Sequence, residues 1–212
     1  MIIVFCGLDG SGKTTLANEA IVFINSQNNK KAIYRHLIKD SFYYKLLHSF
    51  IAKISPGSKN ILEKGLREEE NKIRGFIVKL LKKALLLLNL VSFNIRFYFY
   101  KKSKHKNVIC DRYFYDDLVQ MEYLNVAGCA FRKFFSSLIL KPDLVFFLEV
   151  NPEIAMVRKP EYDTDYFKNK SKLYSQFFKK VDAVIVPMQG LVLNKQIILS
   201  GLRGLFNQNY VS

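Results

Sequence analysis

The sequence predicts a three-layer α/β fold, in which a five-stranded parallel sheet is flanked by helices on both faces. Short apolar runs alternate with longer segments of helical periodicity along the chain, and this order is typical of a parallel sheet built from strand–helix units. The first apolar run leads directly into a glycine-rich turn and then a helix. With 212 residues, of which 50% are hydrophobic, the chain can bury a core, so we expect residues 1–212 to form one domain.

The strands are expected where short apolar runs lie between turn signals. Pro142 and Pro152 bound the fourth run, and Pro152 also suits the first turn of the helix that follows it. The predicted strands are residues 2–5, 32–35, 107–110, 144–150 and 183–186.

The helices are expected where apolar residues recur every three or four positions. In the first of them, Leu16, Ala20 and Ile24 lie on one face. Pro56 separates the second helix from a long third segment, which is largely helical in one or two pieces. The predicted helices are residues 13–27, 40–54, 62–104, 116–125, 131–140, a helix from Pro152, 165–180 and 191–206.

The net charge indicates which classes of binding partner would suit the chain. The 33 Lys and Arg residues outnumber the 18 Asp and Glu residues, which gives a formal net charge of +15 and a positive field over much of the surface. Nucleic acid, an anionic membrane surface or small phosphorylated substrates would exploit that field, although a solvated Lys-rich surface with no specific partner would look the same. An aromatic content of 14% argues against a disordered chain.

The cysteines and the amino end predict a cytoplasmic protein. Cys6, Cys110 and Cys129 form no C-x-x-C pair, and the first two lie inside apolar runs, so we expect reduced thiols. Met1 leads into an apolar run with no basic segment before it, and Asp9 follows at once, which is unlike a signal peptide.

One Leu-rich and aromatic stretch, residues 84–100, resembles a membrane segment in composition. Asn89, Asn94 and Arg96 interrupt it, whereas a spanning helix needs about 20 consecutive, mostly apolar residues. We therefore expect no transmembrane segment here, but a buried or dimer-forming helix. The alternative is a helix at a membrane surface, with the flanking lysines meeting lipid headgroups. Those lysines are Lys82, Lys83, Lys101 and Lys102.

The glycine-rich turn carries the strongest functional signal. It reads Gly7-Leu8-Asp9-Gly10-Ser11-Gly12-Lys13-Thr14 and fits the pattern G-x-x-x-x-G-K-[ST], with a strand before it and a helix after it. In such a loop the backbone N–H groups and the helix N-terminus face phosphate oxygens. Lys13 would reach the β- and γ-phosphates, and Thr14 would offer its hydroxyl to a magnesium ion. We predict that this loop, with Thr15, binds ATP and Mg²⁺.

Two other classes with such a loop are excluded by what the chain lacks. A GTPase needs a D-x-x-G motif, and none occurs outside the loop itself. It also needs N-K-x-D to select guanine, but Asn194-Lys195-Gln196 is followed by Ile197. The Ser-Gly-Gly signature of a transport-type ATPase is absent as well.

Three blocks of the sequence resemble the thymidylate kinase family. They are the loop with an Asp in its third position, the strand followed by Asp111-Arg112-Tyr113, and residues 141–153 with Arg158 after them. The order and spacing of these blocks match those of the family from Ile2 to about Tyr174. The resemblance implies the P-loop NTPase fold and transfer of the γ-phosphoryl of ATP to a nucleoside monophosphate such as dTMP. It also implies a homodimer formed through helices, to which residues 85–88 could contribute.

Several side chains follow as site candidates. Asp111 ends a strand beside the loop, where a carboxylate can hold magnesium, usually through water. A planar guanidinium such as that of Arg112 suits the acceptor phosphate, and the resemblance implies the same role. It further implies that Asp9 bonds the acceptor's 3′-hydroxyl and that Arg158, in a short lid at residues 158–165, supplies the cation for phosphoryl transfer. Structural roles stay open for each of them, as a helix cap, a turn residue or an ion pair.

The acceptor half of the site departs from the family. The Arg-Glu-Pro-Gly-Gly block is missing, and Arg35 is the residue that could replace its arginine. Asp116 and residues 119–121 stand where the family has Ser and Ala-Tyr-Gln, and Arg96 is the nearby candidate for a helix arginine facing the acceptor. Another nucleotide, a nucleoside or a phosphorylated sugar is therefore a plausible acceptor.

A second hypothesis belongs to another class. The chain could be a nucleotide-dependent protein that uses its basic surface to hold nucleic acid or membrane, without kinase activity. Its retention on DNA or RNA would depend strongly on salt. The chain shows no aromatic–basic stacking motif of a known nucleic-acid module, which counts against this hypothesis.

Overall fold

The five strands form one parallel sheet in the order β2-β3-β1-β4-β5. The computed structural model describes residues 1–27, 31–36, 72–102, 107–126, 128–160 and 162–211. The strands are β1 (Ile2–Gly7), β2 (Ala32–His36), β3 (Asn107–Asp111), β4 (Leu144–Glu149) and β5 (Val184–Pro187). The predicted parallel sheet is confirmed, and its order places β1 in the centre.

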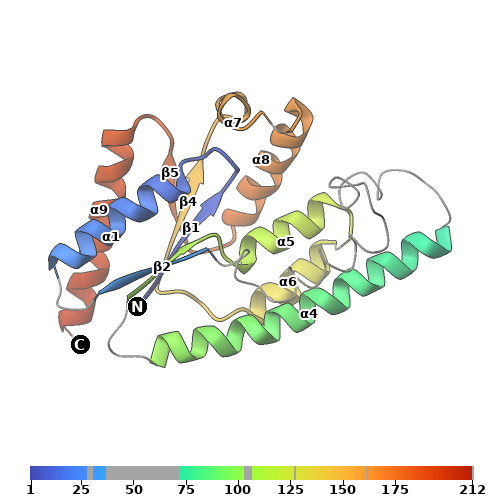
Figure 1. Ribbon diagram of the computed structural model, residues 1–212, viewed down its shortest axis with the longest axis horizontal. Coiled ribbons are helices and arrows are strands. Elements are labelled where there is room, and N and C mark those ends of the chain that lie inside the picture. The colour runs from blue at the N-terminus through green and yellow to red at the C-terminus, as the bar shows by residue number, and fades with distance from the viewer. Residues whose placement is uncertain (28–30, 37–71, 103–106, 127, 161, 212) are drawn as a thin grey trace.

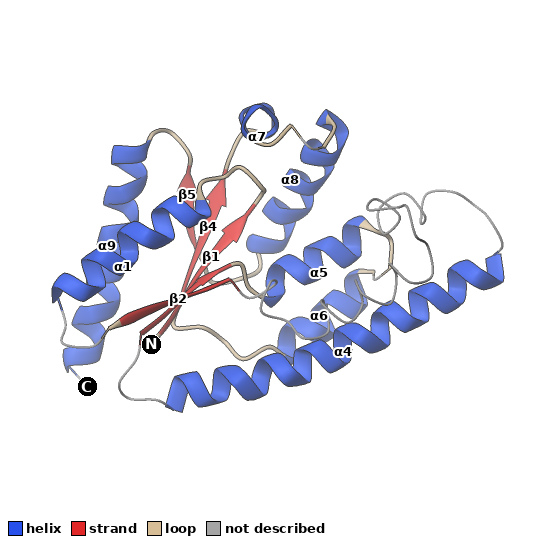
Figure 2. Cartoon of the chain, viewed as in Figure 1, coloured by secondary structure: helices blue, strands red, loops and turns tan. Residues whose placement is uncertain are grey.

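Helices cover both faces of the sheet (Figure 1). On one face lie α1 (Lys13–Gln27) and α9 (Leu191–Val211). On the other face lie α4 (Lys72–Lys102), α5 (Phe114–Tyr123), α6 (Cys129–Leu138) and α8 (Thr164–Phe178). The short helix α7 (Pro152–Arg158) follows the carboxyl end of β4, above the sheet in Figure 2.

Alternating residues of β1 supply both cores, because successive side chains of a strand point to opposite faces. Val4 and Cys6 are buried against the α4, α5 and α8 side, while Ile3 and Phe5 are buried against α1 and α9. All six residues of β1 are buried, as expected for a central parallel strand covered on both faces. The carboxyl edge of the sheet, where the glycine-rich loop follows β1, is therefore held by a strand that is buried over its whole length.

The helix α4 is continuous over its described 31 residues. Leu86, Leu90, Phe93 and Phe97 recur at helical spacing and are buried in the core, so the packing of this face fixes α4 against the sheet layer. The described helices include none that is long and apolar enough to cross a membrane. The predicted helix at residues 40–54, and the part of the third helix before residue 72, lie outside the described residues.

The element boundaries differ from the sequence prediction by a few residues. The helix α5 begins at Phe114 rather than at 116, because the Asp116 side chain accepts a hydrogen bond from the backbone N–H of Tyr113 at 2.9 Å. This bond belongs to a capping box, which starts the helix two residues earlier. The helix α9 continues to Val211 instead of ending at 206. The single-domain organisation stays a prediction.

Candidate active site

The loop between β1 and α1 curls tightly because its three glycines, Gly7, Gly10 and Gly12, adopt conformations that other residues avoid. Gly7 has a φ of +144°, and a Cβ there would lie 2.6 Å from the carbonyl oxygen of Leu148 on β4. Gly10 has a φ of +81°, and a Cβ there would lie 2.8 Å from the carbonyl oxygen of Ala155 on α7. Glycine is therefore required both for the turn and for the close approach of β4 and α7.

Lys13 is buried inside the curl of the loop. Its Nζ donates hydrogen bonds to the carbonyl oxygens of Gly7 at 2.9 Å and Leu8 at 2.6 Å, and to the Ser11 hydroxyl at 3.4 Å. Burial lowers the pKa of Lys13, while the negative charges of Asp116 and Asp111 oppose that shift. The ammonium group thus sits in a cradle of loop oxygens at the point where the strand ends.

Thr14 and Asp111 meet at the carboxyl edge of the sheet. The Thr14 hydroxyl donates to Asp111 Oδ2 at 2.5 Å, and the Tyr34 hydroxyl of β2 donates to the same oxygen at 2.7 Å. Burial, together with the bond to Asp111, raises the pKa of Tyr34 to about 12, which keeps it a donor. The other oxygen, Asp111 Oδ1, is buried and has no hydrogen-bond partner.

That unpaired oxygen fits a hydrated magnesium ion. A hydroxyl and a carboxylate are hard oxygen ligands of the kind that Mg²⁺ takes, usually with substrate phosphates and several waters. Among the described residues, no group of three or more His, Cys, Asp or Glu side chains is placed to hold a metal. A cation at Thr14 and Asp111 would therefore depend on the phosphates of a nucleotide to complete its coordination.

Arg112 and Asp9 form an ion pair, although they are 103 residues apart in the sequence. Arg112 continues the β3–β1 ladder, since its backbone N–H donates to the Phe5 carbonyl at 2.9 Å. Its φ of +72° is unusual for a residue other than glycine and turns the guanidinium toward the loop. Burial alone would lower the pKa of Arg112, but nearby Tyr174 and Asp116 outweigh it and the pKa is raised.

Asp116 has a structural role in the described contacts. Besides the Tyr113 backbone N–H, it accepts a hydrogen bond from the Tyr174 hydroxyl of α8 at 2.7 Å, and it is only 2% exposed. It therefore ties α5 to α8 instead of presenting a free carboxylate. The neighbouring Asp117 is half-buried, and burial, with Asp116, raises its pKa to about 7 while Arg112 acts in the opposite direction.

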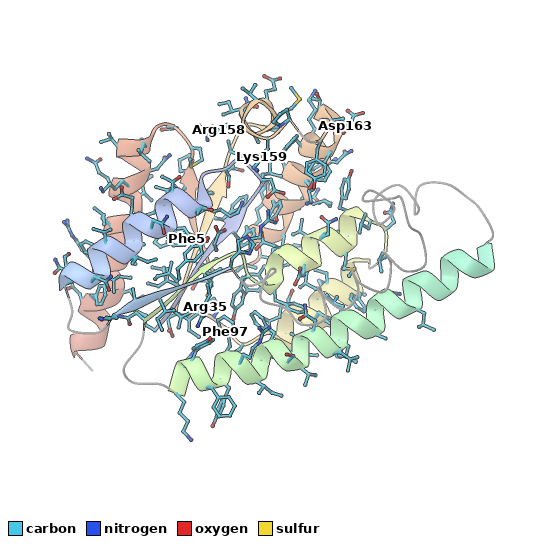
Figure 3. The ribbon with its side chains drawn as sticks, in the orientation of Figure 1. Phe5, Arg35, Phe97, Arg158, Lys159 and Asp163 are labelled. Atoms are coloured by element: carbon cyan, nitrogen blue, oxygen red, sulfur yellow. The ribbon has the colours of Figure 1, made fainter. Side chains whose placement is uncertain are left out.

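The segment predicted to be a lid, residues 158–165, contacts the loop through Arg158. Arg158 ends α7, and its Nη1 donates to the Gly10 carbonyl at 3.2 Å. The Asp163 side chain caps α8 by accepting from the Tyr166 backbone N–H at 2.7 Å, so α8 already begins at Thr164. Figure 3 labels Arg158, Lys159 and Asp163 together above the carboxyl edge. Two nearby acidic residues in the sequence could pair with Arg158. Asp163 serves as a helix cap, and Glu161 lies outside the described residues.

The two further arginine candidates have contacts elsewhere. Arg35 pairs in register with Cys110 and faces α4, where its Nε donates to the Tyr100 hydroxyl at 3.2 Å. Figure 3 shows Arg35 well away from Arg158. Arg96 donates from Nε to the Ser92 carbonyl, one turn earlier in α4, at 3.4 Å. The described contacts bring neither arginine to the Arg112–Asp9 pair.

The sequence analysis missed Tyr34 and Asp117. Tyr34 lies on a strand with no local motif, so only its parallel register with β3 reveals that it reaches Asp111. Asp117 follows Asp116, and a signal was available in that pair of adjacent carboxylates on the first turn of a helix. The two residues behave differently because consecutive helical positions face different directions.

Comparisons with known proteins agree with this geometry. A sequence model of the thymidylate kinase family matches residues 66–193. A probable thymidylate kinase of Methanocaldococcus jannaschii is 28% identical over 201 residues, which cover 88% of this chain and 86% of that protein. The match with the family model includes Asp111, Arg112 and residues 158–165, and the relative extends the likeness over most of the chain.

Two solved structures share the fold at 16% identity. The crystal structure of thymidylate kinase from Ehrlichia chaffeensis superposes with a TM-score of 0.62, over 97% of this chain and 98% of that one. The deoxyadenosine kinase from M. mycoides, with the products dCMP and dCDP bound, superposes with a TM-score of 0.59 over 96% and 100%. Because the family model alone spans more than half of the chain, this protein belongs to the thymidylate kinase family, whose members are ATP-dependent nucleotide kinases.

Proposed function

We propose that this kinase transfers the γ-phosphoryl group of ATP to the phosphate of a nucleoside monophosphate, dTMP-like by its family. The Arg112–Asp9 ion pair supports this proposal most directly, because it sets a guanidinium and a carboxylate beside the loop that holds Lys13. A guanidinium suits the acceptor phosphate, and a carboxylate suits a sugar hydroxyl.

The donor phosphates are assigned to the loop and the first turn of α1. The backbone N–H groups of the loop and the N-terminus of α1 form an anion-binding site. Lys13 would leave the Gly7 and Leu8 carbonyls for the β- and γ-phosphates, replacing one set of oxygen partners with another. The residues assigned to ATP are Gly7, Leu8, Asp9, Gly10, Ser11, Gly12, Lys13, Thr14 and Thr15.

Thr14 and Asp111 are assigned to magnesium. The support is the unpaired, buried Asp111 Oδ1 together with the Thr14 hydroxyl at 2.5 Å from Oδ2. Bound there, the ion would neutralise charge on the phosphates of ATP during transfer.

Arg112, Arg35 and Asp9 are assigned to the acceptor, and Arg158 to the transferring group. Arg158 reaches the Gly10 carbonyl from α7, so its guanidinium lies beside the loop that cradles the phosphates. A cation there stabilises negative charge that grows in the transition state. Arg35 would exchange its bond with Tyr100 for one with the acceptor.

A nucleoside acceptor is the second candidate, and one observation favours it. The carboxylates of Asp9, Asp116 and Asp117 all lie near Arg112. The negative charges of Asp9 and Asp116 disfavour a dianionic phosphate at this position, whereas a neutral sugar hydroxyl carries no such repulsion. The two acceptors differ in whether the 5′ group is a phosphate or a hydroxyl, so one assay distinguishes them.

We also propose that two copies associate through α4, in the cytoplasm. The outward face of α4 is apolar and exposed, with Leu88 at 49%, Ile95 at 53% and Phe99 at 65%. Figure 2 shows this helix along the outside of the molecule. A second copy would cover that face. An Ile95→Glu variant should then elute as a monomer in light-scattering chromatography, and a monomeric parent protein would refute this assignment.

The proposed location in the cytoplasm is supported by the cysteines. The two described cysteines, Cys6 and Cys110, are both free, as is usual for cytoplasmic proteins.

ADP release over a panel of acceptors tests the main proposal. The panel contains nucleoside monophosphates, nucleosides and sugar phosphates, each with ATP and Mg²⁺. We expect release that depends on a monophosphate, with dTMP among the best. Release that requires a nucleoside would favour the second candidate. Acceptor-independent release, combined with salt-sensitive retention on DNA, would instead favour the nucleic-acid-binding hypothesis.

A further inference from the structure

The strand β2 presents two polar side chains beside Asp111. His36 pairs in register with Asp111, and Tyr34 pairs with Ile109. Because residues two apart on a strand share a face, Tyr34, His36 and Asp111 all lie on the same side of the sheet. Ile109 packs in the core formed with α1, so this is the side on which Thr14 begins its helix.

The hydrogen bonds of Asp111 are distributed unevenly over its two oxygens. Thr14 and Tyr34 both donate to Oδ2, while Oδ1 is buried and unpaired. Two donors from different elements fix the plane of the carboxylate. They also leave the lone pairs of Oδ1 free to accept from a ligand.

His36 provides a second buried atom without a partner. Its Nδ1 has no hydrogen bond, and its residue is adjacent to Asp111 on the next strand, where neighbouring strands are about 4.8 Å apart. Leaving such a buried polar atom unpaired is unfavourable. Two buried, unpaired polar atoms on adjacent strands, on one face, indicate a polar ligand between them.

We propose that Tyr34 and His36 are part of the magnesium site, an extension that rests on the proposed function. Tyr34 is a positioning residue, which holds Asp111 through Oδ2 so that Oδ1 meets the metal's water. His36 Nδ1 bonds a second water of the same hydrated ion. Imidazole is a poor direct ligand for Mg²⁺, which keeps several of its waters, so the contact runs through water.

Metal binding tests the proposal without reliance on turnover. The probe is Mn²⁺, titrated against the protein with ADP and followed by the electron paramagnetic resonance signal of the free ion. Tyr34→Phe removes one hydroxyl and keeps the ring, and we expect roughly tenfold weaker Mn²⁺ binding. The matched control is Tyr100→Phe, which removes the hydroxyl that bonds Arg35 on the opposite face of β2 and should leave Mn²⁺ binding unchanged.

A pair of variants tests His36. We expect His36→Leu to weaken Mn²⁺ binding several-fold and His36→Asn, whose amide can replace Nδ1, to restore much of it. Metal-free ADP binding should stay the same in all variants, which separates a metal effect from a folding defect. Equal Mn²⁺ affinity in the parent protein, Tyr34→Phe and His36→Leu would overturn this inference alone. A parent protein that binds neither ADP nor Mn²⁺–ADP would instead overturn the proposed function.

Discussion

The ion pair between Arg112 and Asp9 joins the end of β3 to the loop that follows β1. It connects the loop assigned to ATP with the side of the sheet assigned to the acceptor. Asp9 would otherwise be an isolated carboxylate in an anion-binding loop, and Arg112 compensates its charge. An acceptor that bonds both residues would replace part of this pair, so binding of the acceptor and the conformation of the loop are coupled.

Lys13→Ala should abolish transfer and leave the protein folded. We assign the Lys13 ammonium to the donor phosphates, so its loss should lower kcat roughly 100-fold or more. The Gly7 and Leu8 carbonyls lose a partner, which costs stability of about 2 kcal/mol. The measurements are ADP release and denaturant unfolding. The control is Lys195→Ala, which removes a surface ion pair with Glu19 and should change ADP release and stability little. Retained turnover in Lys13→Ala would contradict the assignment of the loop to the donor phosphates.

Arg112→Ala should weaken binding of the acceptor far more than binding of ATP. The expected result is a raised KM for the acceptor with a nearly unchanged KM for ATP, measured by steady-state kinetics. Arg112→Gly is the informative partner variant, because glycine accepts the φ of +72° without strain. It should be more stable than Arg112→Ala by about 1 kcal/mol and should raise the KM for the acceptor equally. Equal losses for both substrates would contradict the assignment of Arg112 to the acceptor.

Arg158→Gln should lower kcat more than either KM. Its guanidinium reaches the Gly10 carbonyl but is exposed, so it is placed to act on a group transferred above the loop and contributes little to the fold. Single-turnover and steady-state rates provide the measurement. Lys168→Gln, an exposed change on α8, is the charge-matched control. An unchanged kcat in Arg158→Gln would show that the lid cation comes from another residue.

Asp117→Asn should flatten the dependence of stability on pH. The folded protein holds a proton on Asp117 up to about pH 7, whereas the unfolded chain releases it near pH 4. The folded state therefore binds more protons between these values, and its stability falls as the pH rises through that window. With solvent screening allowed for, Asp117→Asn should gain about 2 kcal/mol over the parent protein between about pH 4 and about pH 8. Urea unfolding at both pH values measures this, and parallel pH profiles for the two proteins would contradict it.

Local patterns predicted the elements and the donor half of the site. The glycine loop was recognisable because its φ values and its helix N-terminus are dictated by a few consecutive residues, with Lys13 and Thr14 at fixed offsets. The alternation of strands and helices was equally visible, because burial on both faces requires short apolar runs. Among the described elements, the differences from the prediction lie at the ends, as at Phe114, where a side-chain cap decides the first turn.

The acceptor side of the candidate site could not be predicted from local patterns in the same way. Asp116 looked like a substitute for a substrate-contacting residue, but in the fold it is bonded to Tyr113 and Tyr174. Arg35 stays a proposed phosphate ligand, and in the fold its side chain donates to Tyr100. Both outcomes depend on which side chain a distant helix supplies, and spacing along the chain carries no information about that.

The sequence by itself determined the phosphate loop, the class of fold and the family, because these depend on residues that are neighbours in the chain. Only the tertiary structure decided that Tyr34 and His36 of β2 flank Asp111, that Arg112 meets Asp9, and that Asp116 is turned inward. The physical reason is the strand order and register. Both are set by the packing of buried side chains against two helical layers, and this packing brings together residues separated by as many as 148 positions.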